Sequence, residues 1–195
     1  MPTDHSNWRL VVAGLCLWLS GCQLASERSA PDAAISASTQ AQFERALEAM
    51  HNDDFRRAEQ ELAALLEQRP ELSGAWINLG HSYLAQDRRD SARDAFDAAL
   101  QHSPDDCRAL NALGVMARQE GEFAHAERKY RRCLDAQPNF REALLNLAIL
   151  YELYLGRLEE ALTLYQRYQT LLEEPDPRVN GWLVDLQRRV NGRAG

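Results

Sequence analysis

A 34-residue period constrains this chain more than any other feature of the sequence. Pro70, Pro104 and Pro138 stand 34 residues apart. Other columns keep the same step: Trp76, Leu110 and Leu144; Leu79, Leu113 and Leu147; Gly80, Gly114 and Ala148; Ala58, Ala92 and Ala126; Leu62, Phe96 and Tyr130. Self-similarity at this spacing predicts an array of like structural units, each packed on its neighbours.

Within each unit the apolar residues follow helical spacing. Trp76, Leu79, Gly80 and Tyr83 stand at i, i+3, i+4 and i+7, which is one face of a helix. The small residue on that face lets a partner helix come close. Each proline ends a second helix, because it cannot donate a hydrogen bond to the preceding turn. The sequence therefore predicts an all-α fold made of helical hairpins.

These columns resemble the tetratricopeptide repeat. Residues 73–106 match its pattern at every signature point: Trp76, Leu79, Gly80, Tyr83, Ala92, Phe96, Ala99 and Pro104. The resemblance implies an α-solenoid of about four hairpins, with units at 39–72, 73–106, 107–140 and 141–174. The first unit departs from the pattern at Gln42 and Arg45. In the fourth, Ala161, Tyr165 and Tyr168 each arrive one residue late.

Both ends of the array carry helix signals. Thr39 and Gln42 have the spacing of a capping box, which predicts that the first helix begins near residues 39–40. After the fourth unit, Asp176 and Pro177 are typical of a helix start. The helix predicted within 175–195 carries an apolar stripe at Val179, Trp182, Leu183, Leu186 and Val190. We expect this helix to cap the fourth unit, with Trp182 in the core.

In solenoids of this kind the first helices of successive units line a concave groove. Three positions per helix, taken through the four units, predict twelve groove residues: Phe43, Leu47, Met50, Ile77, His81, Leu84, Asn111, Val115, Arg118, Leu145, Ile149 and Glu152. Eight of them are apolar, which indicates a site for an apolar helix or extended segment of another protein. Arg118 and Glu152 would orient that segment. The alternative is that the N-terminal segment or the C-terminal helix covers part of the groove.

The N-terminal segment carries the pattern of a targeting signal. An apolar run of ten residues, 10–19, follows Arg9 and is half the length that spans a bilayer, so residues 1–21 are predicted to be a signal peptide. Residues 19–22, Leu-Ser-Gly-Cys, resemble the bacterial lipoprotein cleavage box. The resemblance implies that Cys22 is acylated, and Gln23 after it favours the periplasmic face of the outer membrane of a Gram-negative bacterium. Residues 22–38, rich in Ala, Ser and charge, are predicted to be a flexible tether.

Two cysteines remain in the repeats. Cys107 and Cys133 lie on the packing stripes of the two helices of the third unit, and an antiparallel hairpin brings them opposite each other. The periplasm is oxidising, so they could form a disulfide. The alternative is two buried thiols that fill alanine-like positions.

Several function classes are excluded or unsupported. A net charge of -7 argues against nucleic-acid binding. The spacing of His102, Cys107, His125 and Cys133 does not match zinc patterns, so no metal site is expected. We find no phosphate loop, nucleophile elbow or metalloprotease motif, and therefore expect no catalytic residues, cofactor or small-molecule substrate.

The resemblance implies a non-catalytic scaffold that binds another envelope protein through the groove and the membrane through its lipid. Lipoproteins with this arrangement resemble adaptors for murein hydrolases or energy-transducing complexes. The alternative is similarity to pilotins, which assemble the secretins of type IV pili or secretion systems.

Overall fold

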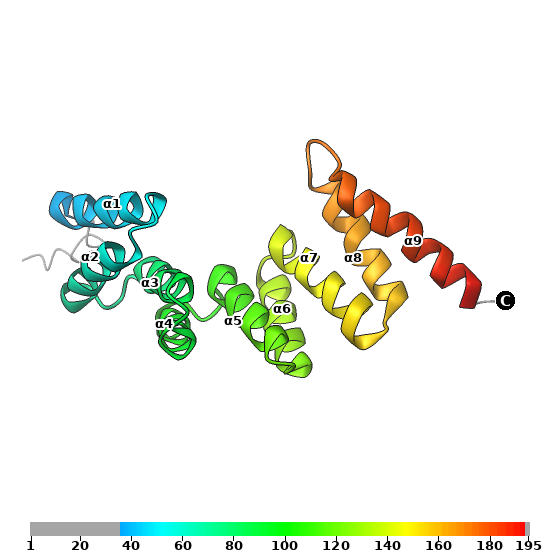
Figure 1. Ribbon diagram of the computed structural model, residues 1–195, viewed down its shortest axis with the longest axis horizontal. Helices are drawn as coiled ribbons and strands as arrows, with labels where there is room; N and C mark the ends of the chain where they lie inside the picture. The colour runs from blue at the N-terminus through cyan, green and yellow to red at the C-terminus, as the bar shows by residue number, and fades with distance from the viewer. Residues whose placement is uncertain (1–35, 194–195) are drawn as a thin grey trace, which may run out of the picture. The chain divides into compact units, whose positions relative to one another are not determined.

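The computed structural model describes residues 36–193, and every regular element in this range is helical. Figure 1 shows the helices following one another from α1 to α9. Their bounds are α1 Ala37–His51, α2 Phe55–Gln68, α3 Ser73–Ala85, α4 Arg89–His102, α5 Cys107–Gln119, α6 Phe123–Ala136, α7 Arg141–Leu150, the π-helix η1 Tyr151–Leu155, α8 Leu158–Thr170 and α9 Pro177–Arg193.

The helices pair into four hairpins, α1–α2, α3–α4, α5–α6 and α7–α8. The second helix of each hairpin also packs on the first helix of the next, and α9 packs on α8. The structure thus confirms the predicted all-α solenoid of four hairpins with a C-terminal helix. Among residues 36–193, no helix combines the length and the apolar character that a membrane span requires.

The turn inside each hairpin has one residue in the left-handed region. These residues are Asp53, Asp87, Gly121 and Gly156, with φ values of 57°, 59°, 80° and 65°. Left-handed backbone favours Gly and tolerates Asp, which explains the residue types. The first three lie 34 residues apart, but Gly156 comes 35 after Gly121. The fourth hairpin therefore holds one extra residue before its turn.

The π-helix η1 absorbs that extra residue. In the first three hairpins the N–H that closes the turn donates to a carbonyl five residues back, as Arg88 does to Tyr83 at 2.9 Å and Glu122 to Ala117 at 2.8 Å. In the fourth, Arg157 N–H donates to the Tyr151 carbonyl, six residues back, at 2.9 Å. A single π turn is the usual way for a helix to carry one inserted residue. The inserted residue is also the cause of the one-residue slip seen in the sequence of the fourth unit.

Close helix contact explains the small-residue column. A Cβ added at Gly80 would lie 2.6 Å from the Phe96 ring, and one at Gly114 would lie 2.5 Å from the Tyr130 ring. Real Cβ atoms do not come that near to an aromatic ring. Phe96 and Tyr130 are fully buried, so neither ring has room to move away. These two hairpins therefore depend on glycine at this position.

Helix α1 begins earlier than predicted. The Ser36 hydroxyl accepts a hydrogen bond from the Thr39 N–H at 3.1 Å, so Ser36 is the N-cap and the helix begins at Ala37. The predicted start near 39–40, with Thr39 as the cap, was wrong, and the segment before the helix ends before residue 38. The signal peptide and Cys22 lie outside the described residues.

The C-terminal helix covers the last hairpin as predicted. Val179 and Leu186 of α9 are fully buried in one cluster with Tyr165 of α8. Trp182 packs against Tyr165 with ring centroids 5.7 Å apart, but it remains 40% exposed. The expectation that Trp182 lies in the core was therefore wrong, because its indole lies at the margin of the α8–α9 contact.

Candidate protein-binding surface

The third hairpin is closed by a disulfide between Cys107 and Cys133. It joins the first residue of α5 to the last turn of α6, with the two Cα atoms 4.8 Å apart. Both residues are buried. Of the two alternatives that the sequence left open, the structure has the disulfide rather than two free thiols.

The first row of predicted groove residues is largely taken up by packing. Ile77 is only 2% exposed, so its prediction as an accessible groove residue was wrong. It is buried because α5 of the next hairpin packs against it through Ala109, Ala112 and Leu113.

The rest of that row is half-buried. Phe43 packs against a core cluster shared by the first and second hairpins, and Leu145 packs against one that extends from the third hairpin to α9. The side-chain carbonyl of Asn111 accepts a hydrogen bond from the Asn146 amide at 2.9 Å. These three residues retain a partly open face.

The second row holds the two most accessible groove residues. Leu47 is 40% exposed and His81 is exposed as well, whereas Val115 and Ile149 are half-buried against the core. The His81 ring meets Phe96 edge-on, with centroids 5.1 Å apart. Although the residue is exposed, contact with Phe96 shields part of its ring from water, and this desolvation together with the positive charge of Arg108 lowers the pKa of His81. A neutral imidazole at this surface can donate or accept a hydrogen bond.

The four residues of the third row have three different environments: two pack against the core, one is a cation and one forms an intramolecular ion pair. Met50 and Leu84 are half-buried against the core. Glu152 accepts hydrogen bonds from Arg189 of α9 at 2.6 Å and from the Tyr165 hydroxyl at 3.0 Å. Its side chain is only 10% exposed. The role predicted for Glu152 in orienting a partner was therefore wrong, because the C-terminal helix already neutralises it.

Arg118 completes the third row and has a different environment. Its guanidinium lies over the Tyr154 ring, 5.9 Å from the centroid. Its buried Nε and the buried hydroxyl of Tyr130 have no hydrogen-bond partner elsewhere in residues 36–193. Burial raises the pKa of Tyr130, and the hydrogen bond and positive charge of Arg118 offset part of that increase.

A hollow of about 340 Å³ opens where the first two hairpins meet. Phe43 of α1 and Arg108 of α5 are among its lining residues, and the Arg108 guanidinium is held by Asp106 at 2.6 Å. The other lining residues are Thr39, Gln40, Glu71, Leu72, Ser73, Gly74 and Ala75. A hollow lined by both apolar and polar residues can receive one side chain of a partner.

A carboxylate links the first hairpin to the second. Arg88 donates to both oxygens of Glu59 at 2.8 Å and lies over the Tyr83 ring, 4.3 Å from its centroid. Burial opposes ionisation of Glu59, but the hydrogen bonds from Arg88 and Gln86 outweigh it and lower the pKa of Glu59. We call Glu59, Tyr83 and Arg88 the Glu59 cluster.

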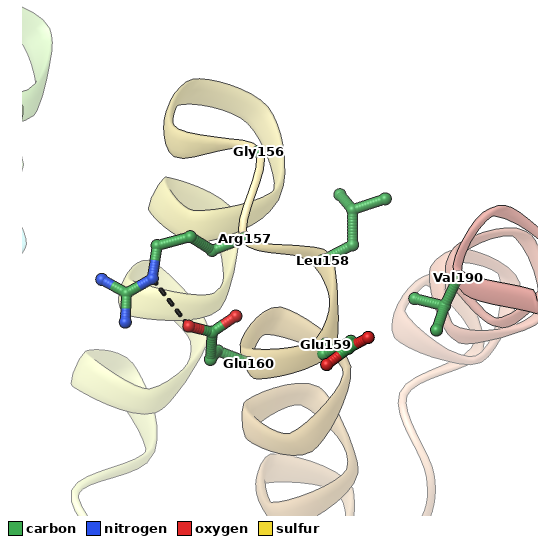
Figure 2. A pocket seen from close by; sticks show the side chains of 6 residues that line it. All are labelled: Gly156, Arg157, Leu158, Glu159, Glu160 and Val190. Atoms are coloured by element: carbon green, nitrogen blue, oxygen red, sulfur yellow. Dashed lines mark hydrogen bonds and ion pairs between the residues drawn. The ribbon is translucent and has the colours of Figure 1, made fainter. Parts of the chain in front are cut away.

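The same arrangement links the third hairpin to the fourth. Glu127 accepts from the Tyr151 hydroxyl and from Arg157, each at 2.8 Å, and Arg157 lies 4.0 Å over the Tyr151 ring. Burial and the bond to Glu127 raise the pKa of Tyr151 to about 12. We call these three residues the Glu127 cluster. Figure 2 shows Arg157 turned toward Glu160, on the side away from Leu158 and Val190.

Comparison with known proteins identifies the family. The tetratricopeptide repeat family matches residues 43–106, 77–139 and 117–177, which together cover well over half of the chain. The chain therefore belongs to the tetratricopeptide repeat family. Proteins of this family are generally non-catalytic interaction scaffolds. Within residues 36–193, no three His, Cys, Asp or Glu side chains are grouped as a metal site would need.

Curated relatives share the repeat but differ in length. The chain is 31% identical over 94 residues to the general transcriptional corepressor ssn6 of Schizosaccharomyces pombe, covering 47% of this chain and 8% of that protein. It is 36% identical over 95 residues to the uncharacterized protein y4yS of Sinorhizobium fredii, covering 49% and 50%. The match is thus to the repeats rather than to whole proteins.

Solved structures show the same fold at low identity. The pilF protein of Pseudomonas aeruginosa aligns with a TM-score of 0.70 and 17% identity, covering 80% of this chain and 70% of that one. A tetratricopeptide repeat protein of Parabacteroides merdae gives 0.66 and 20%, covering 81% and 62%. MamA gives 0.61 and 20%, covering 68% and 77%. These likenesses establish the architecture.

Sequence reasoning missed Leu153 and Tyr154, two of the most exposed large apolar side chains within 36–193. Both lie in η1, which carries the inserted residue. The one-residue slip of the fourth unit was the available signal. A period slip shows that an insertion exists, but it does not show which side chains the insertion brings to the surface.

Proposed function

We propose that this chain is an outer-membrane lipoprotein whose repeats hold another envelope protein on the periplasmic side. The tetratricopeptide repeat array carries this proposal, because stacked hairpins leave accessible side chains on a rigid scaffold. The lipoprotein box ending at Cys22 supplies the membrane anchor. Several buried acyl chains hold a protein at a membrane far more firmly than one.

The client we favour is a hydrolase or an energy-transducing subunit, for which the chain acts as an adaptor. Leu47 and His81, the accessible residues of the predicted groove, offer an apolar and a neutral polar contact. The hollow lined by Phe43 offers a further place for a partner side chain. The chain itself performs no chemical step in this scheme.

A pilotin-like role is the second candidate. The likeness to the pilF protein over 80% of this chain, at a TM-score of 0.70, favours it. In this role the acylated chain would deliver secretin subunits to the outer membrane. The two candidates differ in the client and agree on the anchor.

Replacement of the acylated cysteine tests the anchor. Cys22→Ala should abolish incorporation of labelled palmitate and move the protein from the outer-membrane fraction to an earlier stage of export. Cys16→Ala, within the same predicted signal peptide, is the matched control and should leave both unchanged. Outer-membrane recovery of the Cys22→Ala protein at the wild-type level would reject the proposal.

The client is tested by crosslinking in membranes. Leu47→Ser combined with His81→Ser should reduce recovery of the client at least tenfold, because these are the accessible residues of the predicted groove. Both residues are exposed, so the loss would report on binding rather than on folding. Gln60→Ser on the exposed side of α2 is the control. Secretin multimers that fail to reach the outer membrane in Cys22→Ala cells would favour the pilotin role; a normal secretin distribution would favour the adaptor.

A further inference from the structure

The inserted residue in η1 changes what the fourth hairpin exposes at its turn. Leu153 is 64% exposed and Tyr154 is 44% exposed. Their counterparts in the second hairpin are Ala85, which is small, and Gln86, which donates to Glu59 at 3.2 Å. The third hairpin has Gln119 there. Only in the fourth hairpin do these positions present large apolar side chains.

Tyr154 is held in place by residues of the third hairpin. Its ring packs against Phe123, the first residue of α6, with centroids 4.8 Å apart. Arg118 of α5 lies on the same ring, with its guanidinium carbon 5.9 Å from the centroid. We call Arg118, Phe123, Leu153 and Tyr154 the η1 patch. It combines an ordered aromatic pair, an open aliphatic side chain and a cation.

The cation of the η1 patch lacks a carboxylate. The neighbouring acids are engaged elsewhere: Glu120 accepts from Arg93 at 2.7 Å, and Glu122 pairs with His125 at 2.9 Å. Glu152, one repeat after Arg118, is bound by Arg189. Across the part of the chain that the structure describes, no salt bridge includes Arg118, and the Tyr130 side chain that it contacts is a neutral hydroxyl. The guanidinium charge therefore has no carboxylate partner, which favours a ligand that supplies one.

We propose that the η1 patch binds a segment of a partner protein in which an acidic side chain stands beside an apolar one. The carboxylate pairs with the Arg118 guanidinium, a contact that is strong because both groups are charged and the fork geometry matches. The apolar side chain packs on Tyr154 and Leu153, and removes their exposed surface from water. This inference rests on the proposed scaffold function and assigns the contact to the turn side of the fourth hairpin.

The probe is a synthetic peptide, acetyl-Ser-Gly-Asp-Leu-Phe-Asp-Gly-Ser-amide, titrated into the ¹⁵N-labelled full chain. The proposal expects saturable shifts of the Arg118 Nε–Hε signal and of the Leu153 and Tyr154 amides. A peptide with Asn in place of both Asp residues should bind at least tenfold more weakly, and so should one with Ser in place of Leu and Phe. Binding should also weaken with added salt.

Two protein variants localise the contact. Arg118→Gln should weaken binding of the acidic peptide at least tenfold and make it insensitive to the Asp-to-Asn change. Tyr154→Ser, at a position that is 44% exposed, should weaken binding three- to tenfold. The matched control is Arg128→Gln, which removes an exposed arginine of α6 and should bind as the wild type does.

The outcomes separate the two proposals. Equal binding of the acidic and amide peptides, or unchanged binding by Tyr154→Ser, would overturn the η1 patch as an acidic-segment site. If the patch fails while Leu47→Ser with His81→Ser still abolishes client recovery, the scaffold function stands and the contact lies on the first helices. If peptide binding succeeds but no client depends on Cys22, the lipoprotein proposal fails and the η1 patch stands.

Discussion

The second and fourth hairpins share a junction design but differ by one residue in length. Each meets the preceding hairpin through a carboxylate, a tyrosine and an arginine, the Glu59 cluster and the Glu127 cluster. The second hairpin reaches its turn with α-helix alone, whereas the fourth passes through η1. The hairpin junction therefore tolerates an insertion when a π turn absorbs it before the turn residue.

The insertion also changes how closely the two helices pack. In the second hairpin Gly80 and Phe96 stand 16 residues apart, and a Cβ would collide with the ring. In the fourth, the corresponding Ala148 and Tyr165 stand 17 apart, and both are buried. The extra residue in the fourth hairpin therefore accompanies the change from glycine to alanine. The same hairpin exposes Leu153 and Tyr154, where the second hairpin has the small Ala85 and the polar Gln86.

The largest expected effect tests the packing difference. Gly80→Ala should lower the free energy of unfolding by about 2–3 kcal/mol, because the added methyl overpacks against a fully buried ring. Ala148→Gly in the fourth hairpin should cost only about 1 kcal/mol, through helix propensity. Urea unfolding followed by circular dichroism measures both. Equal costs would show that the second and fourth hairpins pack alike, and would contradict the packing difference described above.

A smaller effect is expected from removing the inserted residue. Deletion of Tyr154 restores the 34-residue spacing, and we expect it to destabilise the protein by about 1–2 kcal/mol, because the Ala148 methyl then meets Tyr165 as a Gly80 methyl would meet Phe96. Ala148→Gly in the same chain should recover most of that loss. A double-mutant cycle from urea unfolding gives the coupling. Strict additivity would contradict a link between the insertion and the alanine.

Acid titration compares the two carboxylate clusters. The pKa of Glu127 is lowered: burial opposes this, and the hydrogen bonds from Tyr151 and Arg157 outweigh burial. Its contribution to stability is therefore full above the ordinary value of 4.5 and is lost as the pH falls through the lowered value. Glu127→Gln should cost less than about 1 kcal/mol at pH 7, since the pair is partly solvated.

Unfolding measured at pH 7 and pH 3 checks this expectation. The cost of Glu127→Gln should shrink at pH 3, and Glu59→Gln should behave alike because the pKa of Glu59 is lowered by the equivalent contacts. Glu67→Gln on the exposed side of α2 is the control. A cost of Glu127→Gln that grows with acid would contradict the assigned ion pair.

The smallest effect concerns the C-terminal helix. Arg189→Gln removes the 2.6 Å contact to Glu152, and we expect a loss of about 0.5 kcal/mol because the arginine is partly exposed. No second-hairpin residue has this constraint, since Leu84 stands at the place of Glu152. Urea unfolding measures this loss of stability, with Arg188→Gln as the neighbouring control.

The repeat period predicted the fold because each unit repeats the same packing problem. Proline spacing and the Gly80 and Gly114 positions are enough to place the hairpins and their close contacts. The groove was predicted less well, because the same period does not state how deeply the next hairpin covers Ile77. Exposure of Leu153 and capture of Glu152 by Arg189 depend on an insertion and on a helix outside the repeats, and no repeat column contains either.

The chain is a binding scaffold, and we propose that its fourth hairpin makes a contact with a partner protein that the second hairpin cannot make. The most direct measurement is photo-crosslinking in cells with p-benzoylphenylalanine in place of Leu153, or in place of its exposed counterpart Ala85. We expect a discrete protein adduct at position 153, its loss in the Arg118→Gln background, and no adduct at position 85. The same adduct at both positions, or one at 153 that survives Arg118→Gln, would contradict this proposal.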